Sequence, residues 1–512
     1  MQHNTISYWN LTGEKTHYPR LTKSLTADVC IVGAGITGVT CAYCLADKGF
    51  KPLLIEAGGI ADGTTGNTTG KVTIQHDIVY SKIRKEYGLD DARNYAVSQQ
   101  SALDFVKSVV FSESIDCQLT ENTAYIYARN EKEWEDVQKE HAAATSVGIA
   151  SALLEKPAFP VENIGMIGFP SQSVFHPVRY VNALADAAVH KGAVIHGGTK
   201  AIKIEKTDDV VRVYCEGDIV IAAKHVVEAT QYPLYDGPNV FFARLYPKRT
   251  YGIAVRAKAD WPEGSFISAG MPTRSFRTHM ENGEKILIAV GDSHLTGRGV
   301  RDMTVHFNNL MGYADRLAGV KEVLAMWSAQ DYDTPDMIPY IGRTSDDSNI
   351  YVATGFKKWG LSTGTLAGMM IADMIEKGSC RFESLYSRTR TDLIAAPGKT
   401  LYGIFSPVAV LLKSKLEGTD DLSGLKPGEG RVIRFEGQKA GIYRDENDDV
   451  TILDITCTHM GTELRFNTAE KTWDCPAHGG RYNADGALLE GPPKDSLKIL
   501  FRGKFDDLPT GT

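Results

Sequence analysis

The stretch Asp28-Val-Cys-Ile-Val-Gly-Ala-Gly-Ile-Thr-Gly38 decides how the N-terminal part of this chain is expected to fold. Its apolar start predicts a buried strand, which runs into a turn with three glycines, Gly33, Gly35 and Gly38. A helix is expected after the turn, and a second strand over residues 52–55 ends at Glu56. This order, with an acidic residue after the second strand, predicts a dinucleotide-binding turn, for which a plain β–α connection is the alternative.

The residues of this turn have separate roles in holding a nucleotide. Gly33 permits the tight turn, and Gly35 lets the backbone approach a pyrophosphate that rests on the helix N-terminus. Glu56 is expected to accept hydrogen bonds from a ribose. A second strand–glycine–helix unit far along the chain favours FAD over NAD, because its helix N-terminus would stabilise negative charge on the flavin. That unit contains glycines with helix packing as their alternative role, namely Gly355, Gly360 and Gly364.

The C-terminal part contains two Cys–His pairs. From residue 426 onward, short alternating strands and turns predict a small all-β module. Within it lie Cys457-Thr-His459 and, after a gap of fifteen residues, Cys475-Pro-Ala-His478. The two thiolates can hold one iron and the two imidazoles the other, as in a [2Fe–2S] cluster. A tetrahedral zinc site with the same four ligands is the alternative.

Composition and charge limit the class of protein. The 512 residues are 43% apolar and 23% charged, with a net charge of −7, which is typical of a soluble globular protein and a poor match for nucleic acid. No apolar stretch reaches the roughly eighteen residues of a membrane helix. The longest, Leu401–Leu412, is expected to be a helix packed between domains, for which a membrane-surface role is the alternative. We recognise no signal peptide and no disulfide framework among the eight cysteines, so a cytoplasmic protein is expected.

The flanks of the two Cys–His pairs resemble the Rieske family. The matching segments are Cys457-Thr-His-Met-Gly461, Cys475-Pro-Ala-His-Gly479 and Gly491-Pro-Pro493, together with Tyr482. This resemblance implies a [2Fe–2S] cluster in preference to zinc, with four ligands, Cys457, His459, Cys475 and His478.

Three positions depart from the respiratory Rieske pattern. Thr462 and Ala477 stand where respiratory Rieske proteins carry two disulfide-forming cysteines, and Gly480 replaces a serine that donates to a bridging sulfide. Because these changes remove a clamp and a hydrogen-bond donor, we expect a reduction potential in the lower half of the Rieske range of about −150 to +300 mV.

Residues 28–375 resemble the D-amino-acid-oxidase (DAO) superfamily of FAD-dependent oxidoreductases, and the whole chain resembles bacterial fusions of such a domain to a Rieske module. Besides the Gly33 turn and the Gly355 unit, the matching pieces are Val226-Val-Glu-Ala-Thr230 and Asp336-x-x-Pro339-x-Ile-Gly342. Gln231 is a departure, because the family often has glycine there. Some members attach the flavin through His or Cys, but Ala57–Val72 contains neither, so FAD is expected to be non-covalent.

The expected fold class is an α/β FAD-binding domain of Rossmann type with a β-rich substrate domain, plus a small all-β Rieske domain. The FAD-binding domain is expected over 1–245 and 325–390, and the substrate domain over 246–324, to which residues 77–180 are candidates to contribute. A linker is expected over 391–425 and the Rieske domain over 426–507.

Arg277, within Ser275-Phe-Arg-Thr-His279, is the candidate for gripping a substrate carboxylate, because the guanidinium fork binds carboxylates bidentately. A solvated arginine at a strand edge is the alternative. The further substrate-side candidates are Arg274, Tyr251 and His279. In the related family the chain passes the flavin near residues 357–359, Lys-Lys-Trp.

The leading functional hypothesis is a FAD-dependent dehydrogenase that oxidises a small amine or amino acid at a C–N bond. Its electrons would pass from FAD to the cluster, and then to a one-electron acceptor, either a protein or a small molecule. An oxidase that uses O₂ directly, with a structural or regulatory cluster, is the first alternative. A non-enzymatic redox sensor or electron carrier is the second.

Overall fold

The computed structural model describes residues 5–207, 210–235, 241–300, 302–390 and 424–508. It divides into two units. The first holds Met1–Val240, Thr250–Ser293 and Asn309–Asp392, and the second holds Phe241–Arg249, His294–Asn308 and Leu393–Thr512. The expected linker over 391–425, with its apolar stretch Leu401–Leu412, lies outside the described residues except at 424–425.

A largely parallel sheet forms one half of the first unit. Its parallel strands are β1 (Leu25–Val32), β2 (Leu53–Ile55), β7 (Val194–His196), β10 (Ile219–Gln231) and β17 (Ile350–Thr354). Antiparallel strands extend it, namely β16 (Tyr340–Arg343), β8 (Ala201–Lys206) and β9 (Val211–Cys215). Strand β1 pairs with both β2 and β10, and its last four residues are buried, as expected for a central parallel strand.

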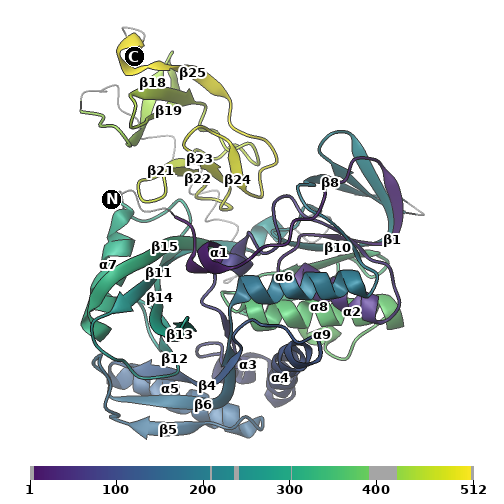
Figure 1. Ribbon diagram of the computed structural model, residues 1–512, viewed down its shortest axis with the longest axis vertical. Helices are drawn as coiled ribbons and strands as arrows, with labels where there is room; N and C mark the ends of the chain where they lie inside the picture. The colour runs from purple at the N-terminus through teal and green to yellow at the C-terminus, as the bar shows by residue number, and fades with distance from the viewer. Residues whose placement is uncertain (1–4, 208–209, 236–240, 301, 391–423, 509–512) are drawn as a thin grey trace. The chain divides into compact units, whose positions relative to one another are not determined.

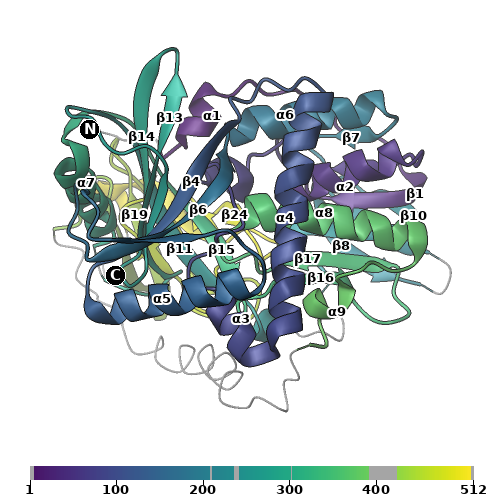
Figure 2. The same cartoon turned by 90° about the horizontal axis from the view of Figure 1, so that it is seen from below.

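Helices pack beside this sheet. Helix α2 (Ile36–Asp47) contacts both α6 (Pro177–His190) and α8 (Gly360–Lys377), and the three lie side by side in Figure 1. The long helix α4 (Leu89–Ser112) crosses α8, as Figure 2 shows. The shorter helices are α1 (Tyr8–Thr12), α3 (Tyr80–Tyr87) and α9 (Glu383–Tyr386), with the 3₁₀ turn η1 (Thr64–Asn67). The expected Rossmann-type α/β architecture is confirmed.

A second, mostly antiparallel sheet draws its strands from distant parts of the sequence. Its order is β15 (Val320–Asp333), β11 (Tyr246–Ala257), β14 (Glu284–Leu295), β13 (Arg274–Glu281), β12 (Ser265–Ser268), β4 (Thr120–Ala128), β6 (Gly165–Val174) and β3 (Lys71–Val72). Strand β5 (Ala152–Glu155) pairs with β6. Helix α5 (Glu131–Ser146) contacts β4 and β6, and α7 (Thr304–Ala318) lies beside β15 in Figure 1. The sheet therefore combines strands within 246–333 with strands that precede residue 175.

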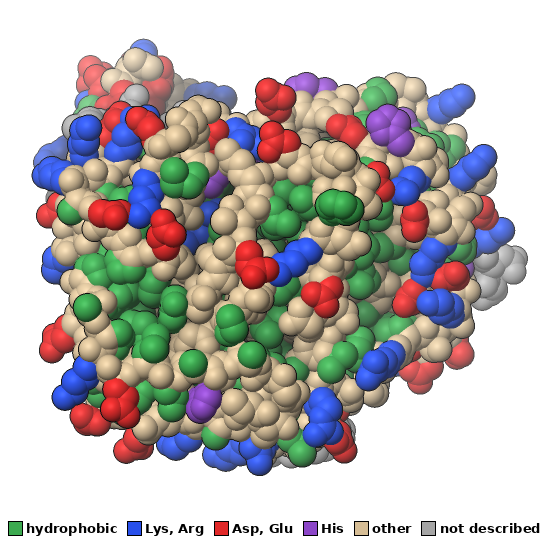
Figure 3. All heavy atoms as spheres, turned by 60° about the horizontal axis from the view of Figure 1, so that its bottom comes forward, with side chains coloured by type: hydrophobic (Ala, Val, Ile, Leu, Met, Phe, Trp, Pro, Cys, Tyr) green, Lys and Arg blue, Asp and Glu red, His purple; other side chains and the backbone are tan. Residues whose placement is uncertain are grey.

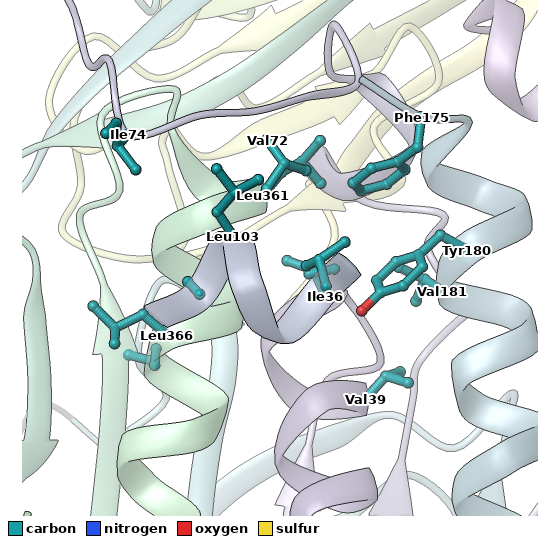
Figure 4. Close-up of a cluster of buried hydrophobic side chains, with 14 of the residues drawn as sticks. Ile36, Val39, Val72, Ile74, Leu103, Phe175, Tyr180, Val181, Leu361 and Leu366 are labelled. Atoms are coloured by element: carbon teal, nitrogen blue, oxygen red, sulfur yellow. The ribbon is translucent and has the colours of Figure 1, made fainter. Parts of the chain in front are cut away.

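One buried cluster joins the helices of the first unit to β3. Figure 4 shows Ile36 and Val39 of α2 beside Val72 of β3, Leu103 of α4 and Leu361 of α8. All five side chains are buried. Burial of an aliphatic side chain of this size contributes about 1.5–3 kcal/mol each. This packing fixes the start of α2, where the glycine turn lies.

The second unit contains two small antiparallel sheets. One is formed by β18 (Gly430–Phe435), β19 (Gln438–Arg444), β20 (Asp449–Leu453) and β25 (Ile499–Lys504). The other is formed by β21 (Arg465–Asn467), β22 (Thr472–Asp474), β23 (Arg481–Asn483) and β24 (Leu488–Glu490). Glu436 and Gly437 both have positive φ and connect β18 to β19 as a two-residue hairpin, the geometry that matches the twist of paired strands.

The surface carries charges of both signs. On the face drawn in Figure 3, acidic and basic side chains are interspersed rather than gathered by sign. Over the part of the chain that the structure describes, no helix combines the length and the apolar character that a membrane crossing requires.

Candidate functional site

The glycine turn after β1 is closed by direct backbone contacts. The N–H of Gly33 donates to the carbonyl of Ile55, 2.8 Å away, and Gly33 has a φ of +104°. A Cβ on Gly33 would lie 2.5 Å from the carbonyl oxygen of Ala229, and one on Gly38 would lie 1.9 Å from the carbonyl oxygen of Gly33. Both positions therefore require glycine, one for the turn and one for the approach of α2 to the strand.

Glu56 lies beside this turn, at the carboxyl end of β2. Its carboxylate accepts hydrogen bonds from the N–H of Ala34 at 2.7 Å and of Gly58 at 2.8 Å. Burial raises the pKa of Glu56. Gly35 is the N-cap residue of α2, and a Cβ there would lie 3.0 Å from the Thr65 hydroxyl. Helix N-terminus, glycine turn and carboxylate thus meet at the ends of β1 and β2, where open α/β sheets bind nucleotides.

The second glycine unit has two kinds of glycine. Gly355 follows β17 with a φ of +78°, and Gly360 has only the Phe356 side chain within 4 Å of its Cβ position. A Cβ on Gly364 would instead lie 2.7 Å from the Thr37 hydroxyl of α2. This contact favours the alternative role of Gly364, helix packing, in which its small size lets α8 approach α2. Gly355 and Gly360 stay candidates for the flavin side.

Gln231 has a backbone conformation that is common for glycine and uncommon for other residues. Its φ is +67°, in the left-handed region that favours glycine. The hydroxyl of Thr354 donates to its carbonyl, and its side-chain amide donates to the carbonyl of Gln330. These bonds hold the strained residue in place.

The substrate-side candidates on β13 are engaged in the fold. Arg277 is buried, donates to the carbonyls of Thr69, Thr278 and Phe175, and lies over the Trp9 ring at 4.9 Å. The guanidinium group of Arg277 is bound to backbone carbonyls and is not available to a carboxylate. The expectation that Arg277 grips the substrate is therefore not supported.

The other three candidates divide between the two faces of the sheet. Arg274 points to the opposite face from Arg277 and pairs with Asp292 at 2.7 Å. His279 shares the face of Arg277, with its Nε2 3.3 Å from a Glu281 oxygen. Tyr251 is fully buried in β11. The structure thus brings Arg277 and His279 together around Trp9 and places Arg274 elsewhere.

Two buried polar residues near the glycine-rich loop were not singled out from the sequence. Lys71 donates to the Ser275 hydroxyl, and burial lowers its pKa to about 7. His76 stacks on Trp359 with 4.9 Å between ring centroids, and burial lowers its pKa to about 3. The signal in the sequence was weak, because residues 71–78 mix polar and apolar side chains.

The two Cys–His loops of the second unit have matched backbone geometry. The N–H of Cys457 donates to the Thr462 carbonyl, and the N–H of Gly461 donates back to the Cys457 carbonyl. In the other loop, the N–H of Cys475 donates to the Gly480 carbonyl, and the N–H of Gly479 donates back to the Cys475 carbonyl. The shared glycines, Gly461 and Gly479, have φ values of +73° and +77°. Each loop is therefore a closed ring that needs glycine four residues after its cysteine.

All four expected ligands lie at these loop tips. The imidazole rings of His459 and His478 are 5.0 Å apart at their centroids and nearly perpendicular. The neighbouring Cys475 thiol, followed by the backbone N–H of His459, lowers the pKa of Cys457 to about 7. The Tyr482 hydroxyl lies 3.7 Å from the sulfur of Cys457. Two adjacent sulfurs with N–H support, beside two imidazoles, fit the ligand set of a Rieske cluster.

Comparison with known proteins agrees with both sites. A model of the FAD dependent oxidoreductase family, DAO, matches residues 28–374. The chain belongs to this family. A model of the Rieske [2Fe-2S] domain matches residues 418–500. The expected cofactors, FAD and a [2Fe–2S] cluster, are confirmed as those of the two matched families.

Individual relatives extend this comparison. The Bacillus subtilis protein YhfW, whose name describes a Rieske 2Fe-2S iron-sulfur protein, is 36% identical over 496 residues, which cover 96% of this chain and 97% of YhfW. Gamma-glutamylputrescine oxidoreductase of Escherichia coli is 24% identical, covering 75% of this chain and 92% of its own. The crystal structure of glycine oxidase from Geobacillus kaustophilus shares the fold, with a TM-score of 0.60, 21% identity, and 72% of this chain and 99% of that chain covered.

Proposed function

We propose that this chain is a FAD-dependent dehydrogenase that oxidises a small amine or amino acid at a C–N bond. It would deliver the electrons through its cluster to a one-electron acceptor, which is either a protein or a small molecule. The observation that carries the proposal is the presence of the glycine turn with Glu56 and the paired Cys–His loops on one chain. When bound, FAD takes up a hydride and a [2Fe–2S] cluster carries single electrons.

The residues of this chain have the task of binding and orienting the two groups. Gly33 and Gly35 would leave room for the pyrophosphate. Glu56 would accept hydrogen bonds from the ribose hydroxyl groups in addition to those from its present N–H partners. FAD would be held without a covalent link. At neutral pH His76 is uncharged, so it can donate or accept a hydrogen bond but carries no positive charge.

Two relatives support the proposed class of substrate. One acts, by its name, on an amine, gamma-glutamylputrescine, and another on an amino acid, glycine. Arg277, Arg274, Lys71 and His76 all have partners within the fold, so we assign none of these side chains to the substrate. None of the eight cysteines, all of which the structure describes, is in a disulfide, which suits the cytoplasmic location that we propose.

An anaerobic screen of amines and amino acids tests the proposal. The holoprotein is mixed with each compound, and bleaching of the flavin absorption band is recorded. A substrate is expected to bleach the band without O₂, and turnover is expected to be faster with an artificial one-electron acceptor than with O₂. Turnover with O₂ that is at least as fast supports the oxidase alternative. No bleaching by any amine or amino acid contradicts the proposed reaction class.

A further inference from the structure

A buried arginine from the middle of the chain enters the unit that holds the cluster ligands. Arg249 and Glu470, 221 residues apart in sequence, form a two-pronged ion pair with side chains 3% and 6% exposed. The Nη1 atom of Arg249 also lies 3.0 Å from an oxygen of Glu490. Arg249 is the last residue of Phe241–Arg249, which lies outside the 418–500 range of the Rieske match.

A second arginine connects the same carboxylates to the cluster loop. Arg481 lies 3.1 Å from Asp474, 2.6 Å from Glu490 and 3.1 Å from Glu470. Asp474 directly precedes the ligand Cys475, and Arg481 directly precedes Tyr482. The side chains of Arg481 and Asp474 are 4% and 3% exposed. Two guanidinium groups and three carboxylates therefore form one network, which brackets the second ligand loop at both ends.

A separate contact reaches the middle of that loop. The Nε of Arg298 donates to the carbonyl of Pro476 at 2.9 Å, and Pro476 lies between Cys475 and His478. A Cβ on the preceding Gly297 would lie 2.6 Å from the nitrogen of Pro476. The N–H of Met303 donates to the Thr468 hydroxyl at 2.9 Å. The segment His294–Asn308 is thus fitted closely to the loop that carries two of the ligands.

We propose that Arg249 and Arg298 are positioning residues for the [2Fe–2S] cluster, so that two segments from the middle of the chain complete the module that holds it. A buried ion-pair network is a poor way to gain stability, because desolvation offsets much of the attraction. Its effect here is to set the geometry and the field at the cluster loop. A reduced cluster carries one more negative charge than an oxidised one, so a nearby guanidinium stabilises the reduced form.

The effect of each substitution on the cluster follows from this charge balance. With two arginines and three carboxylates the network has a net charge of −1, and Arg249→Met changes this net charge to −2. The reduced cluster is then less favoured, so the midpoint potential falls. Arg249→Lys keeps the charge but not the two-pronged geometry, and its midpoint is expected between those of the wild type and Arg249→Met. Arg298→Met removes a cation and a donor at Pro476, and also lowers the midpoint.

The experiment is a redox titration of the full-length protein with both cofactors, followed by electron paramagnetic resonance. Arg256→Met is the matched control, because Arg256 lies on the same strand as Arg249 and pairs with Glu284 and Glu322 at the surface. Its midpoint is expected to equal that of the wild type. Iron content, FAD content and the flavin absorption band check the folding of each variant. Loss of iron with FAD retained in Arg249→Met also supports the proposal.

Wild-type midpoints and unchanged spectra in both Arg249→Met and Arg298→Met overturn the proposal. An equal shift in Arg256→Met overturns it as well, because the effect would then not be specific to the network. If Arg249→Met loses both FAD and iron, Arg249→Lys and Arg298→Met decide in its place. None of these readouts depends on the substrate, so failure here leaves the proposed function standing, and failure of the substrate screen leaves this proposal standing.

Discussion

The position that a Cβ on Gly480 would occupy lies 2.5 Å from the Cγ of Pro493 and 3.7 Å from the sulfur of Cys457. A serine at position 480 would therefore point toward the cluster loop, but Pro493 fills the space that it needs. With Pro493 in this position, residue 480 has room for glycine but not for a larger side chain.

We predict that Gly480→Ser alone destabilises the cluster module by about 1–3 kcal/mol through overpacking. The double variant Gly480→Ser with Pro493→Ala removes the obstructing Cγ. It is expected to raise the midpoint above that of the wild type, because the hydroxyl can donate to a sulfur. The wild-type midpoint is expected in the lower half of about −150 to +300 mV. A redox titration of the wild type, Gly480→Ser and the double variant measures their midpoint potentials, with Pro493→Ala as the control. A wild-type midpoint near the top of the range contradicts the expected low potential.

Tyr482→Phe is predicted to lower the midpoint. The Tyr482 hydroxyl is near the sulfur of Cys457 and accepts from the N–H of Thr458 at 3.2 Å. Loss of a donor to a ligand sulfur makes the reduced cluster less stable. A tenfold change in the equilibrium constant corresponds to about 59 mV for one electron, so a shift of tens of millivolts is expected. Tyr443→Phe, which makes the same change in β19 of the same unit, is the control. An unchanged midpoint in Tyr482→Phe shows that the Tyr482 hydroxyl does not tune the cluster.

The sequence was sufficient where the controlling contacts are local. Gly33 and Glu56 were identified from a turn and the end of the next strand, and the structure places them side by side. The family, the fold class, the reaction class of the family and both cofactors were confirmed. The same holds for the cluster loops, whose glycines have the positive φ that closed rings require.

The sequence failed where distant segments meet. Arg277 was expected to face a substrate, but its partners are carbonyls of Thr69 and Phe175, which are 208 and 102 residues away. No local sequence pattern predicts partners that are this far away along the chain. Arg249 was not singled out for the same reason, since Glu470 and Glu490 lie in another part of the sequence. The order of the second sheet, from β15 to β3, likewise depends on long-range pairing.

Lys71→Met is predicted to change how stability depends on pH. Burial lowers the pKa of Lys71 from 10.5 to about 7, so the unfolded chain binds more protons than the folded one between these values. In the wild type, the free energy of unfolding therefore gains up to about 1.4 kcal/mol per pH unit across this window, relative to the variant. Urea unfolding of both proteins from pH 6 to 10 checks this. Parallel curves would falsify the assignment of a neutral Lys71 above pH 7.

His478→Ala is predicted to remove the cluster and to leave substrate-dependent flavin reduction within about threefold of the wild type. His478 is an expected cluster ligand in the second unit, whereas the glycine turn and Glu56 belong to the first. Stopped-flow absorbance under anaerobic conditions measures the rate, with His141→Ala as a control that keeps both sites. Loss of flavin reduction while FAD stays bound shows that the cluster does more than accept electrons.

Electron transfer from FAD to the cluster can be followed after substrate is added to the oxidised, anaerobic holoprotein. Freeze-quench samples are examined by electron paramagnetic resonance for the signal of the reduced cluster, at several protein concentrations. Electron transfer within one chain predicts that this signal appears after flavin bleaching, with a first-order rate that does not depend on protein concentration. A cluster that stays oxidised while substrate fully bleaches the flavin would contradict electron transfer from FAD to the cluster.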